Sequence, residues 1–316
     1  MDRAELLQET RNLLVSAGFI VSESFEMRLA GFDMVARREE TLLIIKVLSN
    51  IDTFSEPVAH GLQRLAQMLK ATPLLIGEKN GFSPLEPNVV YDRFGVQAIT
   101  LATLNNHIIE DLPVWAYAGP GGFYVNLDTE RIRRLRQEKH LSLGEFARFV
   151  RVSRRTVQMY EGGMSARVDI AARIEELLES PVITPIDLWK NIPEPDLPLE
   201  ANLEQMKAFQ REVFSLLHRV GYKIVPMDRC PFEAVSKERD SVLLTCIQEY
   251  NKRLRKKAEV LANLSKVTEK QAVVFLDREI TRRNLAGTPI IMKRELKKIR
   301  DPEDIANLIT ERTDEQ

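Results

Sequence analysis

The sequence predicts an α+β multidomain protein in which two duplicated α/β units, each a mixed sheet with flanking helices, enclose a central all-α unit. Three observations predict this organisation. The chain has 316 residues, whereas a single hydrophobic core rarely grows beyond about 250–300 residues. The residue pattern of the first hundred positions returns after residue 199. Between the two repeats, apolar residues recur at the spacing of short helices.

The first repeat alternates helical and strand-like segments. Helices are predicted at residues 2–17, 55–71 and 101–109. Strands are predicted at residues 19–23, 32–36, 42–48, 74–77 and 96–99. Gly18 ends the first helix, and Ser55 followed by Pro57 is a favourable start for the second. This order of elements indicates a mixed sheet with helices on both faces.

The second repeat begins at residue 199 and matches the first at a constant offset. The paired strands, separated by 200 residues, are Phe32–Val35 with Phe232–Val235 and Leu42–Val47 with Val242–Ile247. The first helix of each copy ends at a glycine followed by an aromatic residue, at Gly18 and at Gly221. A similar order of elements can arise by chance, but a fixed offset across two strands favours an internal duplication.

Two segments interrupt these patterns. Residues 112–127 contain a glycine-rich turn at 119–122, and residues 181–199 contain five prolines. Proline at this density prevents a long helix. The first segment has room for a short strand at 123–125, and the second for a short helix at 186–191. We therefore expect domains at residues 1–111, 128–180 and 200–316, with linkers at 112–127 and 181–199.

The central unit contains the spacing of two short helices joined by a tight turn. The inward face of the first helix consists of Leu143, Phe146, Ala147 and Val150. Ser142 and Ser153 precede the two helices, and a serine hydroxyl there accepts a hydrogen bond from a first-turn N–H. The second helix directs Val157 and Tyr160 inward, which leaves Arg154, Arg155 and Gln158 outside. These observations predict a helix-turn-helix.

Residues 131–178 resemble a helix-turn-helix domain of the Cro and phage-repressor type. The matching positions are the Arg-rich first helix, Ser142, Ala147, Val152-Ser153 and the run Tyr160-Glu161-Gly162-Gly163. The resemblance implies that Arg154, Arg155 and Met159 contact bases. It also implies a buried ion pair between Arg136 and Glu161. The turn residue is Arg151 where the family usually has glycine, and a non-glycine residue at positive φ carries a modest strain.

The residue types on the second helix suit DNA recognition, because arginine pairs with guanine and glutamine with adenine in the major groove. The candidate DNA-binding residues are Ser142, Arg151, Ser153, Arg154, Arg155, Thr156, Gln158 and Met159. Charge agrees with this assignment. Residues 131–167 hold ten basic and three acidic residues, or +7, so the rest of a chain of net charge −1 sums to −8. A locally basic module is typical of phosphate contact, although a charge run taken alone is also compatible with a solvated face.

The first repeat resembles nucleases of the PD-(D/E)xK superfamily, in particular the archaeal Holliday-junction resolvases. The motif is Gly31-Phe32-Asp33 followed by Ile44-Ile45-Lys46. That chemistry needs two carboxylates on a divalent metal, and position 44, which shares a strand face with Lys46, is isoleucine. In the second copy the matching positions are Glu233, Leu244 and Cys246. We therefore expect both copies to keep the fold without catalysis, unless Glu5, Glu9, Glu39 or Glu40 supplies the second carboxylate.

Other classes of site have little support in the sequence. Cys230 and Cys246 are the only cysteines and form no C-x-x-C pair, so disulfide and zinc frameworks are not expected. No apolar run reaches the roughly 18 residues of a membrane span, and the charged N-terminus is unlike a secretory signal. We expect a cytoplasmic protein without a nucleotide, a cofactor or a metal, and the sequence does not identify an effector.

The chain as a whole resembles a family of archaeal helix-turn-helix transcriptional regulators. This resemblance implies a sequence-specific regulator that binds double-stranded DNA, is not an enzyme, and carries inactive nuclease-like domains. We expect a homodimer, because such proteins commonly bind two half-sites about 34 Å apart. Two alternatives remain open: an active nuclease or resolvase directed by the helix-turn-helix, and an architectural protein that binds DNA without sequence preference.

Overall fold

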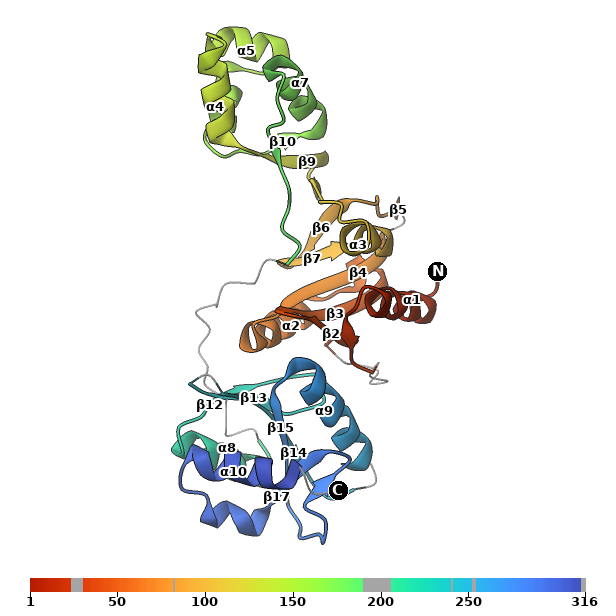
Figure 1. Cartoon of the computed structure of the whole chain (residues 1–316), viewed down its shortest axis with the longest axis vertical. Coiled ribbons are helices and arrows are strands. Elements are labelled where there is room, and N and C mark those ends of the chain that lie inside the picture. The colour runs from red at the N-terminus through yellow and green to blue at the C-terminus, as the bar shows by residue number, and fades with distance from the viewer. Residues whose placement is uncertain (24–30, 82, 190–205, 240, 252–253, 314–316) are drawn as a thin grey trace. The chain divides into compact units, whose positions relative to one another are not determined.

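Figure 1 shows the computed structural model of the chain, which describes residues 1–23, 31–81, 83–189, 206–239, 241–251 and 254–313. The chain forms two compact units. One comprises Met1–Thr10, Leu48–Phe54 and Leu75–Lys190, and the other Arg11–Val47, Ser55–Leu74 and Asn191–Gln316. No helix of the described residues is long and apolar enough to cross a membrane.

The first repeat has the predicted alternation of helices and strands. Its helices are α1 (Arg3–Ser16), the short 3-10 turn Ile51–Thr53, α2 (Glu56–Leu69) and α3 (Leu101–Ile108). Its strands are β1 (Ile20–Val21), β2 (Met34–Arg38), β3 (Thr41–Asn50), β4 (Thr72–Asn80), β5 (Ser83–Pro84), β6 (Val89–Arg93) and β7 (Val96–Ile99). The strand order is β1-β2-β3-β4-β7-β6-β8-β9-β10, with β5 beside β4 and β11 beside β9. The last strands of this order come from later in the chain: β8 (Ala116–Gly119), β9 (Gly122–Leu127), β10 (Ala166–Arg167) and β11 (Ile183–Thr184). The mixed α/β class expected from the sequence is therefore confirmed.

Strand β6 was not predicted from the sequence. It pairs with β7 in an antiparallel hairpin with Tyr91 opposite Ala98 and Arg93 opposite Val96. The connecting residues Phe94 and Gly95 both have positive φ, at 54° and 75°. Tight hairpin turns need positive φ, which usually selects Asn or Gly at both positions. Because Phe94 stands at the first of these two positions, the turn lacks the residue pattern that would predict it.

The segment at 112–127, expected to be a linker, contains β8 (Ala116–Gly119) and β9 (Gly122–Leu127). These strands pair with each other, and β8 also runs parallel to β6. Tyr117 and Tyr124 stack across the hairpin with ring centroids 5.9 Å apart, and Tyr124 donates a hydrogen bond to the carbonyl of Pro120 (2.7 Å). The strand expected at 123–125 lies within β9.

The expected short helix at 186–191 is a wrong prediction for its described part. Ile183–Thr184 forms strand β11 on β9, and Ile186 forms an isolated antiparallel bridge with Val114. The amide of Ile186 donates to the carbonyl of Val114 at 2.7 Å, and this long-range partner replaces helical hydrogen bonding. Residues 190–191 lie outside the described residues.

The second repeat has its own sheet, in the order β12-β13-β14-β15-β17-β16. Its strands are β12 (Lys223–Pro226), β13 (Ala234–Glu238), β14 (Ser241–Gln248), β15 (Gln271–Leu276), β16 (Asn284–Leu285) and β17 (Thr288–Met292). Its helices are α8 (Ala208–Arg219), α9 (Leu254–Thr268), the 3-10 segment Lys293–Lys298 and α10 (Pro302–Thr313). The core of this domain packs Phe214 and Leu217 of α8 against Phe275 of β15 and Ile305 of α10.

Strand register confirms the duplication. In the first copy, Met34 pairs with Ile45 and Val35 with Ile44. In the second copy, Ala234 pairs with Thr245 and Val235 with Leu244. Each pair is displaced by 200 residues at both ends, so the sequence offset is also an offset in hydrogen-bond register. A slip of one residue would reverse the face of every side chain, so the two copies place equivalent positions on equivalent faces.

Candidate nucleic-acid interface

The central module is built from four helices: α4 (Thr129–Glu138), α5 (Leu143–Val150), α6 (Arg154–Tyr160) and α7 (Val168–Leu178), with the two-residue strand β10 (Ala166–Arg167) before α7. Their buried faces form one core that includes Ile132, Phe146, Val157 and Ile174. The strand β9 adds Val125 and Leu127 to this core. The helix-turn-helix expected from the apolar spacing is therefore present as α5 and α6.

Both helices begin at the predicted serine caps. The Ser142 hydroxyl accepts a hydrogen bond from the amide of Glu145 (3.2 Å), and the Ser142 amide donates to the Glu145 carboxylate (2.9 Å). This is a capping box, and the Ser142 bonds hold the pKa of Glu145 below its usual value. The Ser153 hydroxyl accepts from the amide of Thr156 at 3.0 Å. Two of the candidate DNA-binding residues, Ser142 and Ser153, thus also fix the ends of their helices.

The turn between α5 and α6 has the predicted strain. Arg151 caps the C-terminal end of α5 in the left-handed region, with φ 60° and ψ 46°. Its amide donates to the carbonyl of Ala147, which satisfies one of the last helical carbonyls. The side chain of Arg151 is exposed. The backbone therefore makes the turn without glycine and places a cation at its surface.

The module is closed by the predicted ion pair. Arg136 of α4 donates to both carboxylate oxygens of Glu161, at 2.6 and 3.3 Å, and to the carbonyl of Leu141 at 3.0 Å. Arg133 adds a hydrogen bond to the carbonyl of Glu161 at 2.9 Å. These contacts fix the C-terminal end of α6 to the helix that precedes the motif.

The arginines of the module divide into two groups. One group has acidic or hydroxyl partners: Arg131 with Ser180, Arg133 and Arg136 with Glu161, Arg134 with Glu138, and Arg167 and Arg173 with Asp169. The other group is Arg148, Arg151, Arg154 and Arg155, which are exposed and form no ion pair within the described parts of the chain. Three members of this second group, Arg151, Arg154 and Arg155, lie at the turn and at the start of α6.

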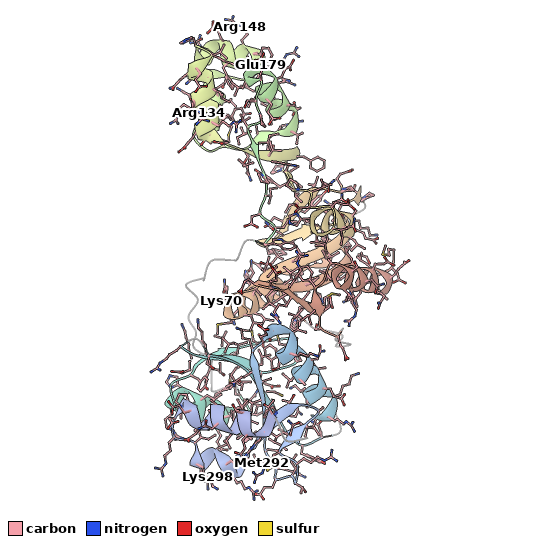
Figure 2. All side chains as sticks on the ribbon, viewed as in Figure 1. Lys70, Arg134, Arg148, Glu179, Met292 and Lys298 are labelled. Carbon is pink, nitrogen blue, oxygen red and sulfur yellow. The ribbon has the colours of Figure 1, made fainter. Side chains whose placement is uncertain are left out.

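The remaining candidates on α6 lie on its outer side. Gln158 and Met159 are exposed, whereas Thr156 is half-buried. The hydroxyl of Thr156 lies 2.8 Å from that of Ser153, so Thr156 belongs to the helix cap as well as to the surface. Figure 2 shows the polar rim of the module, where Arg134 of α4 and Arg148 of α5 project outward. Both residues are exposed.

Sequence reasoning missed the role of Gly144 in the first turn of α5. A Cβ atom built on Gly144 would lie 3.0 Å from Nε and from one terminal nitrogen of Arg154. The guanidinium of Arg154 therefore lies against the bare backbone of α5. Only the contact between the two helices reveals this, because Gly144 and Arg154 are ten residues apart. Glycine at position 144 leaves space for Arg154, which is one of the residues expected to contact bases.

The nuclease motif of the first copy forms a hydrogen-bonded cluster. Asp33 accepts a hydrogen bond from the amide of Val47 (2.8 Å) and from the Lys46 ammonium (3.3 Å), and both side chains are largely buried. Ile44, which stands at the position of the second carboxylate, is fully buried. A buried alkyl side chain cannot bind a cation that requires oxygen ligands. No group of three or more His, Cys, Asp or Glu residues that could hold a metal occurs among the described residues.

The second copy keeps the same geometry with a lysine from a different element. Glu233 accepts a hydrogen bond from the amide of Ile247 (2.6 Å) and pairs with the Lys257 ammonium of α9 (2.6 Å). Sequence alignment at the offset of 200 placed Cys246 at the lysine position and missed Lys257. Burial raises the pKa of Cys246 well above its usual range. Burial opposes the charge of Lys257, but the adjacent Cys246 and Glu233 raise its pKa above the usual value, so it stays an ammonium.

Comparison with known proteins identifies two of the domains. Residues 3–114 match the PD-(D/E)XK superfamily domain, and residues 132–182 match the helix-turn-helix domain family. No solved structure matches the chain. The class of protein is therefore a helix-turn-helix protein joined to a nuclease-like domain.

Full-length relatives identify the family. The chain is 36% identical to a protein of Methanospirillum hungatei over 98% of this chain and 99% of that protein. It is 36% identical to one of Natronomonas pharaonis over 99% and 100%, and 34% identical to one of Archaeoglobus fulgidus over 99% of each. All three are named "Putative HTH-type transcriptional regulatory protein". The chain belongs to this family of archaeal HTH-type transcriptional regulatory proteins.

Proposed function

We propose that the protein is a sequence-specific transcriptional regulator that binds double-stranded DNA through α6 in the major groove. One observation carries the proposal: Arg151, Arg154 and Arg155 are exposed and without an ion pair in the described residues, whereas most neighbouring arginines have partners. Arginine is the most frequent partner of guanine, and unpaired cations at a helix start also suit phosphate oxygens. The names of the full-length relatives support the same class.

We further propose that the regulator acts as a homodimer and that its nuclease-like domains do not cut DNA. Dimeric proteins of this class bind half-sites one helical turn apart. The buried Ile44 and the hydrogen-bonded pairs at Asp33 and Glu233 support loss of catalysis. In both copies the carboxylate is held by a lysine and a backbone amide.

Selection of bound sequences from a random DNA pool tests the proposal. The expected result is enrichment of one sequence with two related half-sites about 34 Å apart, or one helical turn. Binding to this sequence and to its scrambled form is then compared across salt concentrations. If recognition is specific, the affinity for the selected sequence should remain much higher than the affinity for the scrambled sequence as salt is added. Equal affinities that fall together would instead identify an architectural DNA-binding protein.

An active nuclease is the second candidate, because Asp33 and Lys46 survive from the motif and lie within hydrogen-bonding distance. The purified protein is incubated with magnesium or manganese and with branched or linear DNA. A regulator leaves both substrates intact. Cleavage that is lost in the Asp33→Asn variant would establish nuclease activity and overturn the inactive assignment.

A further inference from the structure

Residues 11–47 and 55–74 of the first copy belong to the same compact unit as residues 191–316, which include the second copy. Helix α9 of the second copy contacts β2 of the first, and helix α2 of the first copy contacts β13 of the second. By position in the repeat, α2 is equivalent to α9 and β2 to β13. The same pair of surfaces therefore meets twice, which is the property of a twofold interface between identical subunits.

The backbone contact between the copies joins nearly equivalent positions. The amide of Gly31 donates to the carbonyl of Arg229 at 2.8 Å. At the offset of 200, Gly31 corresponds to Pro231, which follows Arg229 by two residues. Near a twofold axis, each residue lies beside its own counterpart or beside a close neighbour of that counterpart. A hydrogen bond between Gly31 and Arg229 is therefore the kind of contact expected near a twofold axis that relates the two copies.

Polar contacts extend the interface away from this point. Arg37 of β2 pairs with the carboxylate of Glu269 at 2.6 Å and donates from Nε to the carbonyl of Val267 at 2.9 Å. Asn263 accepts from the amide of Glu23 at 2.8 Å. The three partners in the second copy lie on α9 or directly after it, so its C-terminal half forms most of the polar contact.

Charge favours this pairing over one between two first copies. Glu269 ends α9 in the left-handed region (φ 54°), as Lys70 ends α2 (φ 54°), so the two residues hold equivalent places. If two chains paired through their first copies in this way, Arg37 of one chain would approach Lys70 of the other, and the like charges would repel. With the second copy as partner, Arg37 faces a carboxylate.

We propose that the second copy is the partner of the β2–α2 surface of the first, so that each chain contains its own dimer of nuclease-like domains. Because both copies belong to one chain, the pairing proceeds at the high effective concentration of linked modules. The surface is then occupied within the chain, and two chains must join through other surfaces. This pairing does not depend on the proposed DNA binding.

A disulfide across the axis tests the proposal in the full chain. A Cβ atom on Gly31 would lie 4.0 Å from Cβ of Arg229, within the range of about 3.5–4.5 Å that disulfides need. The variant carries Gly31→Cys and Arg229→Cys, with both native cysteines replaced (Cys230→Ser, Cys246→Ala). The expected product is an oxidised chain of single-chain mass, formed in the same yield at any protein concentration. Its thermal midpoint should exceed that of the reduced form.

The matched control is Gly61→Cys with Arg229→Cys in the same background. A Cβ atom on Gly61 has nothing within 4 Å, so this pair should stay reduced. If the Gly31→Cys, Arg229→Cys variant forms no more disulfide-bonded single chain than the control does, the proposal is overturned. A disulfide found only at twice the chain mass would also overturn it, because the surface would then join two chains.

Charge reversal gives a second test that needs no cysteine. Arg37→Glu and Glu269→Arg should each increase hydrogen exchange at the contact edge, in β2 and in the last turn of α9. The double variant restores an attractive pair and should recover the parent protection. If both single variants exchange like the parent, Arg37 and Glu269 do not hold the two copies together, and the proposed interface fails.

Discussion

Arg136 and Glu161 form a two-pronged ion pair, with nitrogen–oxygen distances of 2.6 and 3.3 Å, that joins α4 to the C-terminal end of α6. Their side chains are only 14% and 9% exposed, so solvent screens the pair little. Each charge has lost most of its water and depends on the other. Removing one partner from such a pair therefore costs more than the pair itself contributes.

We predict that Arg136→Gln destabilises the module by about 3 kcal/mol, at the lower end of the cost of leaving a buried charge unpaired. Hydrogen exchange of the α4, α5 and α6 amides in the full chain measures this loss. The double variant Arg136→Gln with Glu161→Gln removes both charges and should recover part of the protection. Arg134→Gln, which breaks the exposed pair with Glu138, is the control and should change stability by less than about 1 kcal/mol. Equal effects of Arg134→Gln and Arg136→Gln would contradict the structural role of Glu161.

Base recognition predicts a different outcome for Arg154 and Arg155. Replacing either residue by alanine should weaken binding to the selected DNA by about 1–3 kcal/mol and relax the sequence preference at one position. Folding should be unchanged, because both side chains are exposed. Binding titrations on the selected site and on single-base variants measure the two effects. Parent-like affinity in both variants would exclude α6 as the recognition helix.

The strained turn predicts opposite effects on folding and on DNA binding. Arg151→Gly relieves the left-handed backbone at φ 60° and should stabilise the module by up to about 1 kcal/mol. If the side chain contacts a phosphate, the same change should lower the salt dependence of DNA binding by about one counterion. Lys70→Gly is the matched control, because Lys70 ends α2 in the same conformation. The Lys70→Gly variant should change stability but not DNA binding. If the salt dependence of DNA binding is unchanged in Arg151→Gly, the side chain of Arg151 does not contact the DNA.

Local patterns made much of this molecule predictable. The capping serines Ser142 and Ser153, the apolar spacing of α5 and the offset of 200 each depend on residues near one another or on a repeated order. Such features follow from helix and strand periodicity. The ion pair of Arg136 and Glu161 was predictable only by resemblance, since nothing in either residue's neighbourhood shows that they meet.

Features set by tertiary contact were missed. Lys257 meets Glu233 from a helix, 24 positions away, where the motif expects a lysine on the strand. Gly144 has a role only because Arg154 lies over it. The bridge of Ile186 to Val114 replaces the expected helix with extended chain. In each case a distant partner supplies the contact, and neither composition nor spacing reveals that partner.

The relocated lysine of the second copy yields the last prediction. Lys257 pairs with Glu233 at 2.6 Å and also donates to Gln248 at 3.2 Å. Lys257→Met removes the ammonium partner of the Glu233 carboxylate, which is only 21% exposed, so it should destabilise the domain by roughly 2–3 kcal/mol. Chemical denaturation of the full chain measures this loss of stability, and hydrogen exchange in β13 and β14 shows whether it arises in this domain.

Two further variants show whether the cost comes from the unpaired carboxylate or from lost packing. Lys257→Met combined with Glu233→Gln removes both charges and should recover most of the stability, because the amide oxygen of glutamine still accepts from Ile247. Lys207→Met breaks the exposed pair with Glu249, whose side chains are 74% and 57% exposed, and should have little effect. If the double variant is as unstable as Lys257→Met, the alkyl stem of Lys257 matters rather than its charge. The ammonium would then not replace the strand lysine of the first copy.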